Sequence, residues 1–147
     1  MDTACHTSVA YLIVDVLDLN DSPPEWKCFD NSTDDSPTAK IHVLENSLPH
    51  YSIFNLSVVD KDSSSNEALL KFYQVGEAVQ EFTVSTSGRV YVRKPLDAES
   101  KRNHTLLVKA FDGLHETVHA FTLEINVDDI NDNSPICHIV SCLLYNL

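Results

Sequence analysis

The side chains that could do chemistry in this chain are mostly carboxylates and carboxamides, and they occur in short clusters. Residues 18–24 read DLNDSPP and residues 129–135 read DINDNSP. Further acids stand in the stretches VLEN, VVDKD, PLDAE and AFDG. Carboxylate and amide oxygens are ligands for hard divalent cations. A solvated acidic surface that binds no ion is the alternative, and the positions of these residues in the fold have to decide between the two.

The overall charge favours a cationic ligand and argues against other partners. The chain of 147 residues has 22 Asp and Glu against 10 Lys and Arg, a formal net charge of −12. A surface of this charge repels nucleic acid and anionic membranes, so we expect neither as a partner. The acids also repel one another, which a divalent cation would relieve. Apolar residues make up 43% of the chain, enough for a packed core.

The two similar clusters are part of an internal repeat. Residues 9–24, VAYLIVDVLDLNDSPP, align with residues 120–135, AFTLEINVDDINDNSP, at an offset of 111 positions. An offset of this size is one domain long. We therefore expect residues 1–23 to be the C-terminal strand and linker of a preceding unit. Residues 24–135 would form one complete unit, and residues 136–147 a divergent tail.

The complete unit has the apolar alternation of β-strands. Apolar and polar residues alternate along residues 121–127 and 106–110, and no window of a dozen residues shows a helical stripe. Turn signals separate seven expected strands, which are residues 40–44, 53–59, 69–75, 82–85, 89–93, 106–110 and 121–127. This number of strands in one unit predicts an all-β fold, a seven-stranded Greek-key immunoglobulin-like sandwich. Trp26 precedes the first expected strand, and we expect it to pack at the base of the sandwich.

On this scaffold the acids lie at strand ends and in loops. Glu45 follows the first strand, Asp60 and Asp62 the second, and Asp112 the sixth. The PLDAE stretch lies between the fifth and sixth strands, and DINDNSP follows the seventh. Strand ends of a sandwich meet at two poles, so acids from distant parts of the sequence can gather there in two clusters.

In this order and spacing, the six motifs resemble the calcium-binding motifs of a cadherin extracellular repeat. The resemblance covers residues 9–135. Each motif is short and weak alone, whereas six in series are specific. The resemblance implies that Ca²⁺ is the bound ion, with three ions between successive repeats. Extracellular modules of this kind bind calcium with Kd of roughly 10⁻⁴–10⁻³ M.

The resemblance also implies a ligand set at each pole. At the C-terminal pole the implied ligands are Glu45, Asp97, Glu99, Asp129, the carbonyl of Ile130, and Asp132, with Asn131 and the carbonyl of Asn133 directed to the third ion. At the N-terminal pole they are Asn20, the carbonyl of Ser22, Asp60, Asp62, the carbonyl of Asn66, and Asp112, with Asp18 and Asp21 for the other two ions.

The chain departs from the family pattern in several places. Ala98 replaces the usual arginine between Asp97 and Glu99, which leaves both carboxylates in place. Ser22 replaces an asparagine at a position that supplies a main-chain oxygen, and Asn66 lies in SSSNEA without the usual glycine. Residues 1–23 lack equivalents of Glu45 and PLDAE, and no DxD motif follows residue 135. The first junction is therefore short of ligands, and the third ion at the second junction lacks its partner motif.

Other chemistry fits the sequence less well. As an EF-hand loop, residues 60–71 have Ser65 where glycine is needed and Lys71 where glutamate is needed. No G-x-S-x-G, H-E-x-x-H or P-loop motif is present, so we do not expect an enzyme. The four cysteines, at positions 5, 28, 137 and 142, allow three disulfide pairings and show no C-x-x-C spacing for a metal site.

These observations predict a calcium-dependent cell–cell adhesion module in which Ca²⁺ stiffens the junctions between tandem repeats. The expected partners are other cadherin-like ectodomains, bound homophilically or heterophilically. Glycosylation sequons at Asn31, Asn55 and Asn103 favour an extracellular or secreted chain. No export signal or bilayer-spanning segment is visible, so we expect membrane attachment only through a longer parent chain. The alternative is a secreted, truncated product that acts as a soluble competitor or calcium-binding fragment.

Overall fold

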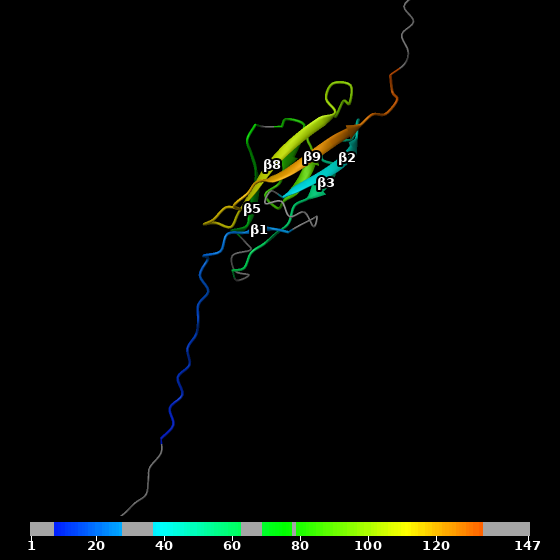
Figure 1. Cartoon of the computed structure of the whole chain (residues 1–147). Helices are drawn as coiled ribbons and strands as arrows, with labels where there is room; N and C mark the ends of the chain where they lie inside the picture. The colour runs from blue at the N-terminus through cyan, green and yellow to red at the C-terminus, as the bar shows by residue number, and fades with distance from the viewer. Residues whose placement is uncertain (1–7, 28–36, 63–68, 78, 134–147) are drawn as a thin grey trace, which may run out of the picture.

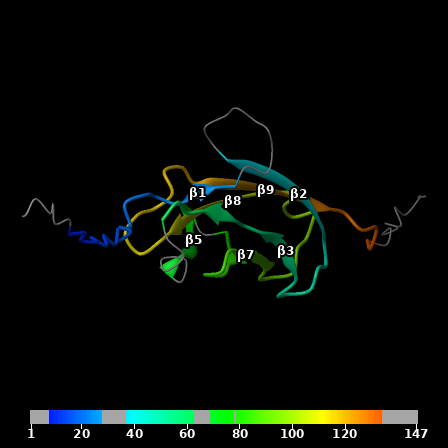
Figure 2. The same ribbon diagram turned by 90° about the horizontal axis from the view of Figure 1, so that it is seen from below.

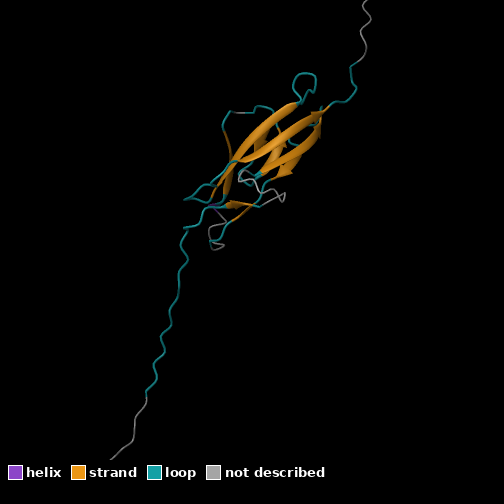
Figure 3. Cartoon of the chain, in the orientation of Figure 1, coloured by secondary structure: helices purple, strands orange, loops and turns teal. Residues whose placement is uncertain are grey.

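The computed structural model describes residues 8–27, 37–62, 69–77 and 79–133, and their regular structure is all β (Figures 1 and 3). The four cysteines, Asn31 and Asn66 lie outside these residues. The strands are β1 (Glu25–Trp26), β2 (Thr38–Leu44), β3 (Ser52–Asn55), β4 (Val58–Val59), β5 (Lys71–Val75), β6 (Phe82–Val84), β7 (Arg89–Val92), β8 (Asn103–Phe111) and β9 (Phe121–Asp128).

The strands form a sandwich of two main sheets. One sheet has the order β2-β9-β8-β5 and the other the order β3-β7-β6, while β1 and β4 form a short pair. Strand β2 runs parallel to β9, and the other pairs are antiparallel. Figure 2 shows β2, β9 and β8 in one layer and β3 and β7 in the other. The expected all-β, immunoglobulin-like sandwich is therefore what the chain forms.

The core lies between the two layers and follows from the alternation in the sequence. Along β9, buried and half-buried residues alternate from Phe121 to Asp128. Strand β8 has the same alternation, with Leu106, Val108 and Ala110 fully buried. Val90 and Val92 of β7 meet them from the other sheet, and both are fully buried. Removing these side chains from water is the main favourable term that holds the layers together.

The seven expected strands occur close to their expected positions, with one division. The expected strand over residues 53–59 is split into β3 and β4. Strand β3 pairs with β7, whereas β4 pairs with β1. At the division, the N–H of Leu56 donates to the carbonyl of Gly88 (2.8 Å), and the Leu56 side chain is buried. The chain crosses here from one partner to another, which apolar periodicity alone does not reveal.

The prediction that Trp26 precedes the first strand is wrong, because Trp26 lies in β1. This strand of two residues is too short to show an alternation. The indole ring packs against Phe121 and Phe72, with centroid separations of 5.1 and 6.0 Å. Its Nε1–H donates to the carbonyl of His119 at 2.8 Å. Trp26 therefore packs at the base of the sandwich, as expected, but as part of a strand.

Residues 8–19 are extended and exposed, and they form no strand in the structure. By the internal repeat, residues 10–17 correspond to β9, which lies between β2 and β8. A strand needs such neighbours for its backbone hydrogen bonds. Figure 1 shows this segment leading away from one end of the sandwich, while residues 129–133 leave the other end. The two DxND motifs are therefore at opposite ends of the molecule.

Candidate metal centres

Three carboxylates meet at the end of the sandwich where β2 and β9 finish. Glu45 follows β2, Glu99 lies in the loop between β7 and β8, and Asp132 follows β9. The two parallel strands end together, with Leu44 opposite Asp128, so the residues that follow them lie at the same pole. One oxygen from each of Glu45, Glu99 and Asp132 lies within 4.8 Å of the others. The acids that are 87 positions apart in the sequence therefore form one cluster, which we call the C-terminal cluster.

Glu45 is fixed by the backbone at this cluster. The N–H of Ala98 donates to its Oε2 at 2.9 Å, and the N–H of Ile130 donates to its Oε1 at 2.6 Å. These two hydrogen bonds hold the pKa of the Glu45 carboxyl below its ordinary value. The residue is only 3% exposed. Glu45 is therefore an ionised carboxylate in a fixed position, linked to the loop after β7 and to the segment after β9.

Asp97 and Asp129, the remaining acids of PLDAE and DIND, lie near this carboxylate but are not among the three whose oxygens converge. Asp97 Oδ1 accepts the N–H groups of Glu99 and Ser100, each at 3.1 Å. Asp129 Oδ2 accepts a hydrogen bond from Arg102 at 3.0 Å. The pKa of Glu99 is raised, because the lowering effect of its own backbone N–H is outweighed by desolvation and by the negative charges of Glu45 and Asp129. A raised pKa of this origin indicates negative charge in excess of nearby positive charge.

Ile130, Asn131 and Asn133 are the other residues expected at this pole, and each has different surroundings. The carbonyl of Ile130 accepts the N–H of Asp132 at 2.5 Å. Asn133 Nδ2 donates to Glu99 Oε1 at 2.7 Å, so this asparagine contacts the cluster through its side chain. Asn131 is exposed, and its neighbour Asn133 is exposed as well. The structure thus brings the acids together around Glu45, while Asn131 is on the solvent side.

A second group of three carboxylates lies at the opposite pole. Asp60 and Asp62 follow β4, and Asp112 follows β8. One oxygen from each lies within 4.8 Å of the others. We call this group the N-terminal cluster. Asp112 is fully buried, and its Oδ1 accepts the N–H groups of Leu114 and His115 at 2.7 and 2.6 Å.

The hydrogen bonds keep Asp112 charged despite its burial. Burial alone would raise the pKa of the Asp112 carboxyl, but the N–H groups of His115 and Leu114 outweigh it and lower the pKa. Asp60 Oδ1 accepts the N–H of Asp62 at 3.0 Å. Asp112 is therefore held in the ionised form, in which a carboxylate is a cation ligand.

The linker residues Asn20 and Ser22 reach this cluster. The N–H of Ser22 donates to Asp62 Oδ2 at 3.0 Å. One terminal atom of the Asn20 carboxamide lies 3.1 Å from Asp112 Oδ2 and 3.0 Å from Asp62 Oδ2. If this atom is the nitrogen, it donates to both carboxylates; if it is the oxygen, the arrangement needs a cation between the three groups. In both orientations the Asn20 amide lies against Asp62 and Asp112. With the amide oxygen on this side, the group offers only oxygen donors, which is the donor set that Ca²⁺ prefers.

Two expected residues of this pole are not brought into the group. Asp18 and Asp21 are exposed and lie outside the three carboxylates. Asp21 Oδ1 accepts a hydrogen bond from Ser22 Oγ at 3.4 Å. Asn66 lies outside the described residues, so its expected carbonyl contact has no structural description.

The motifs did not indicate two residues at the C-terminal pole. Asn46 Nδ2 donates to Asp132 Oδ2 at 2.7 Å, and Asn46 has a positive φ of 58°. Asparagine tolerates this left-handed conformation better than most residues, so its place after Glu45 in VLEN was a usable signal. Arg102 binds Asp129, and no spacing rule in the sequence pointed to it.

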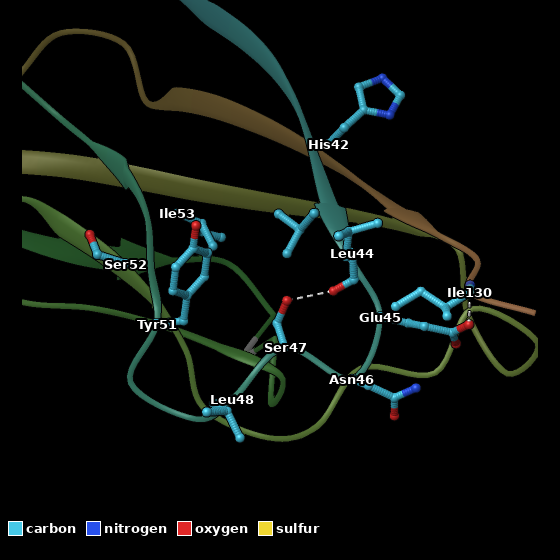
Figure 4. A pocket seen from close by; sticks show the side chains of 11 residues that line it. His42, Leu44, Glu45, Asn46, Ser47, Leu48, Tyr51, Ser52, Ile53 and Ile130 are labelled. Atoms are coloured by element: carbon cyan, nitrogen blue, oxygen red, sulfur yellow. Dashed lines mark hydrogen bonds between the residues drawn. The ribbon is translucent and has the colours of Figure 1, made fainter. Parts of the chain in front are cut away.

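A hollow of about 660 Å³ lies beside the C-terminal cluster (Figure 4). Glu45 and Ile130 stand at one end of it and Tyr51 at the other. The exposed side chains of Leu48 and Tyr51 contribute to its apolar lining. The cluster is thus bordered by a partly apolar surface.

Comparison with known proteins agrees with this geometry. A family model described as "Cadherin domain" matches residues 39–128, which covers both sheets from β2 to β9. This chain belongs to the cadherin family. Cadherins are adhesion proteins and not enzymes, and cadherin domains in general bind calcium.

Curated cadherins resemble the chain over most of its length. Protocadherin Fat 1 from Homo sapiens is 36% identical over 138 residues, which is 89% of this chain and 3% of that protein. The Fat-like cadherin-related tumor suppressor homolog from Drosophila melanogaster is 33% identical over 133 residues, 90% of this chain and 3% of that protein. The chain therefore spans a small fraction of the length of these relatives.

Solved structures show the same fold. The extracellular domain of Protocadherin GammaB4 superposes with a TM-score of 0.66 and 26% identity, and the matched region is 80% of this chain and 17% of the protocadherin chain. Chicken VE-cadherin EC1-2 superposes with a TM-score of 0.63 and 25% identity, and the matched region is 78% of this chain and 54% of the VE-cadherin chain. Among the described residues, no helix has the length and hydrophobicity that a membrane span requires.

Proposed function

We propose that this chain is a calcium-binding adhesion module of an extracellular cadherin ectodomain. Residues 24–135 form one complete repeat, and residues 1–23 are the last strand and linker of a preceding one. The single observation that supports this most is the pair of carboxylate clusters at opposite ends of one sandwich. Solubility alone requires acids on the surface, but it does not require them to gather at the two ends of the sandwich.

The C-terminal cluster would hold Ca²⁺ through Glu45, Asp97, Glu99, Asp129, Asp132 and the carbonyl of Ile130. Calcium, when bound, supplies positive charge to these groups. Glu45 cannot turn away, since two backbone N–H groups fix it. Glu99 and Asp132 are exposed, and their mutual repulsion opposes the position that the segment after β9 occupies. Compensation of this charge would therefore order residues 129–133 relative to the sandwich.

The N-terminal cluster would act on the preceding linker in the same way. Asp60, Asp62 and Asp112 belong to this sandwich, whereas Asn20 and Ser22 belong to the linker and already contact them. Asp18, Asp21 and the carbonyl of Asn66 complete the expected ligands. With both ends held, successive repeats would form a stiff rod, and a distal repeat could meet a cadherin-like partner on another cell. The same proposal includes membrane attachment through a longer parent chain. It also includes partners that are cadherin-like ectodomains, bound homophilically or heterophilically.

A calcium titration followed by thermal unfolding tests this function. With Kd of roughly 1 mM, 10 mM Ca²⁺ stabilises by about 1.4 kcal/mol per site, which raises Tm by several degrees. Asp132→Ala should reduce this increase. The matched control is Glu124→Ala, because Glu124 is an acid of the sheet face that pairs with Lys40 at 2.9 Å. A Tm that is independent of calcium up to 10 mM in all three proteins would contradict the proposal.

A further inference from the structure

We propose that Asn103 is a site of N-linked glycosylation, and that its oligosaccharide lies over the outer face of the β2-β9-β8-β5 sheet. Asn103-His104-Thr105 is a glycosylation sequon that the calcium sites do not use. The inference depends on the proposed extracellular placement of the native chain, because the modification occurs in the secretory pathway. Its chemistry is otherwise independent of calcium.

The structure presents the sequon in a form that accommodates a sugar. Asn103 and Thr105 are exposed, whereas His104 between them is buried at 4% exposure. Alternation along β8 therefore directs both sequon side chains to solvent and anchors the strand through His104. Among the described residues, the Asn103 carboxamide has no hydrogen-bond partner, so attachment of a sugar breaks no contact there.

A hollow lies directly against this sequon. Its volume is about 620 Å³, and both Asn103 and Thr105 line it. Gln80, Glu81 and Lys101 add polar groups that can bind sugar hydroxyls, and Leu107 adds apolar surface for a sugar ring face. The first sugars therefore have space beside β8 and complementary groups to contact.

The other sequons among the described residues differ from this one. Asn20-Asp21-Ser22 is engaged at the N-terminal cluster, where the Asn20 amide contacts two carboxylates. Asn55 is exposed at the end of β3, but its sequon ends in Ser57, which is half-buried. Neither of these sequons lines the hollow beside Asn103. The described structure thus favours Asn103 as the acceptor.

The transfer itself balances with one co-reactant, a lipid-linked oligosaccharide diphosphate. The Nδ2 atom of Asn103 forms a bond to C1 of the first N-acetylglucosamine. The bond between C1 and the phosphate oxygen breaks, and the lipid diphosphate leaves. The amide loses one proton to a base of the transferase, and no oxidation or reduction occurs.

The location has a consequence for adhesion. Asn103 is opposite Asn126, and Thr105 is opposite Glu124, so all four share the outer face of this sheet. A glycan at Asn103 would cover this polar face and keep other proteins away from it. Contacts between molecules would then use the β3-β7-β6 side or the poles.

The test is secretion of the full chain from mammalian cells behind a cleavable signal peptide. Peptide mapping after enzymatic deglycosylation in heavy-oxygen water labels each occupied asparagine. We expect label at Asn103 in the wild type and in Thr105→Ser, and loss of one glycan mass in Asn103→Gln and Thr105→Ala. Asn55→Gln is the matched control and should retain the label at Asn103.

Unlabelled Asn103 in the secreted wild-type protein would overturn the proposal. So would an unchanged glycan mass in both Asn103→Gln and Thr105→Ala. The calcium melt reports separately on the adhesion proposal, since the same secreted protein can be titrated after deglycosylation. Failure of one inference is therefore distinguishable from failure of the other.

Discussion

At the scale of single residues, Asn20 can have two roles beside its carboxylates, as a hydrogen-bond donor or as a cation ligand. It lies 3.0–3.1 Å from Asp62 and Asp112. Without a cation, its N–H₂ group donates to both and reduces their repulsion. With a cation, its oxygen would be a ligand instead. The same side chain can thus serve the metal-free and the metal-bound states by turning its amide over.

Asn20→Asp tests these two roles together. Without calcium, the variant should be less stable, because it replaces two hydrogen bonds by a fourth carboxylate beside Asp60, Asp62 and Asp112. Each like-charged pair at 4 Å costs on the order of 1 kcal/mol in water. With calcium, the added carboxylate should enlarge the calcium-induced rise in Tm relative to the wild type. Asn103→Asp in protein made without glycosylation is a suitable comparison, because Asn103 is exposed on the outer face of β8 and is not an expected ligand. A smaller calcium-induced rise in Asn20→Asp than in the wild type would argue against Asn20 as a ligand.

How far the sequence predicts individual residues depends on what fixes them. Glu45 and Asp132 come together because each follows one of two parallel paired strands, and the motifs marked both. The contact of Asn46 with Asp132 depends on a backbone conformation with positive φ. The contact of Arg102 with Asp129 depends on the direction of a long side chain, which the spacing of the sequence does not determine.

At the scale of elements, strands β5 and β8 are joined by a polar contact on the outer face of their sheet. Tyr73 and Lys109 are register partners. The Tyr73 hydroxyl donates to Glu116 Oε1, and Lys109 Nζ binds Glu116 Oε2 at 3.1 Å. Desolvation and the hydrogen bond to Glu116 raise the pKa of Tyr73 to about 12. The neutral phenol is therefore the form that the folded sheet favours.

This contact predicts a loss of stability at high pH. Because the pKa is raised on folding from 10.0 to about 12, the contribution is complete below pH 10 and is lost as the pH rises toward 12. Titration of the tyrosinate absorbance of the folded protein should show a late step that Tyr73→Phe removes. Tyr51→Phe, a change at an exposed tyrosine, should leave that step in place. A late step that survives in Tyr73→Phe would contradict the assignment.

The elements themselves were largely predictable from alternation, since each buried strand must place every second residue inward. The exceptions have physical reasons. Strand β1 has two residues and cannot display a period, and its tryptophan is held by packing against Phe72 and Phe121. The division between β3 and β4 follows from a change of partner strand, which is a tertiary property.

At the scale of the whole molecule, the order of parts along the chain is more informative than any one motif. A DxND motif enters one end of the sandwich and another leaves the opposite end (Figure 1). Each cluster combines acids of this sandwich with a linker. The internal repeat predicted this arrangement, because two copies of one linker must flank one unit. The hollow beside Asn103 was not predictable in the same way, since it forms from the loop after β5 and the edge of β8.

The same repeat explains an exposed apolar segment at the start of the described chain. Residues 10–17 correspond to β9, yet Tyr11 and Leu12 are 91% and 88% exposed. At the positions of Thr122 and Glu124 in β9, this segment has Tyr11 and Ile13. Both of its faces are therefore apolar where β9 has one apolar and one polar face. Such a strand without neighbours has unpaired backbone groups and favours association with other chains.

Deletion of residues 1–17 should therefore reduce self-association without loss of the fold. The deletion keeps Asp18 and the linker, and the exposed residues that it removes contribute nothing to the core. We expect concentration-dependent oligomers of the full chain by light scattering, and a monomer of the truncated chain with a Tm within a few degrees. The double variant Leu12→Asp, Val14→Asp keeps the length of the chain and should behave as the truncated one does. If the full chain stays monomeric over the same concentrations, or if the truncated chain unfolds at a much lower temperature, the segment is either inert or part of the folded unit, and its assignment to a preceding repeat would lose this support.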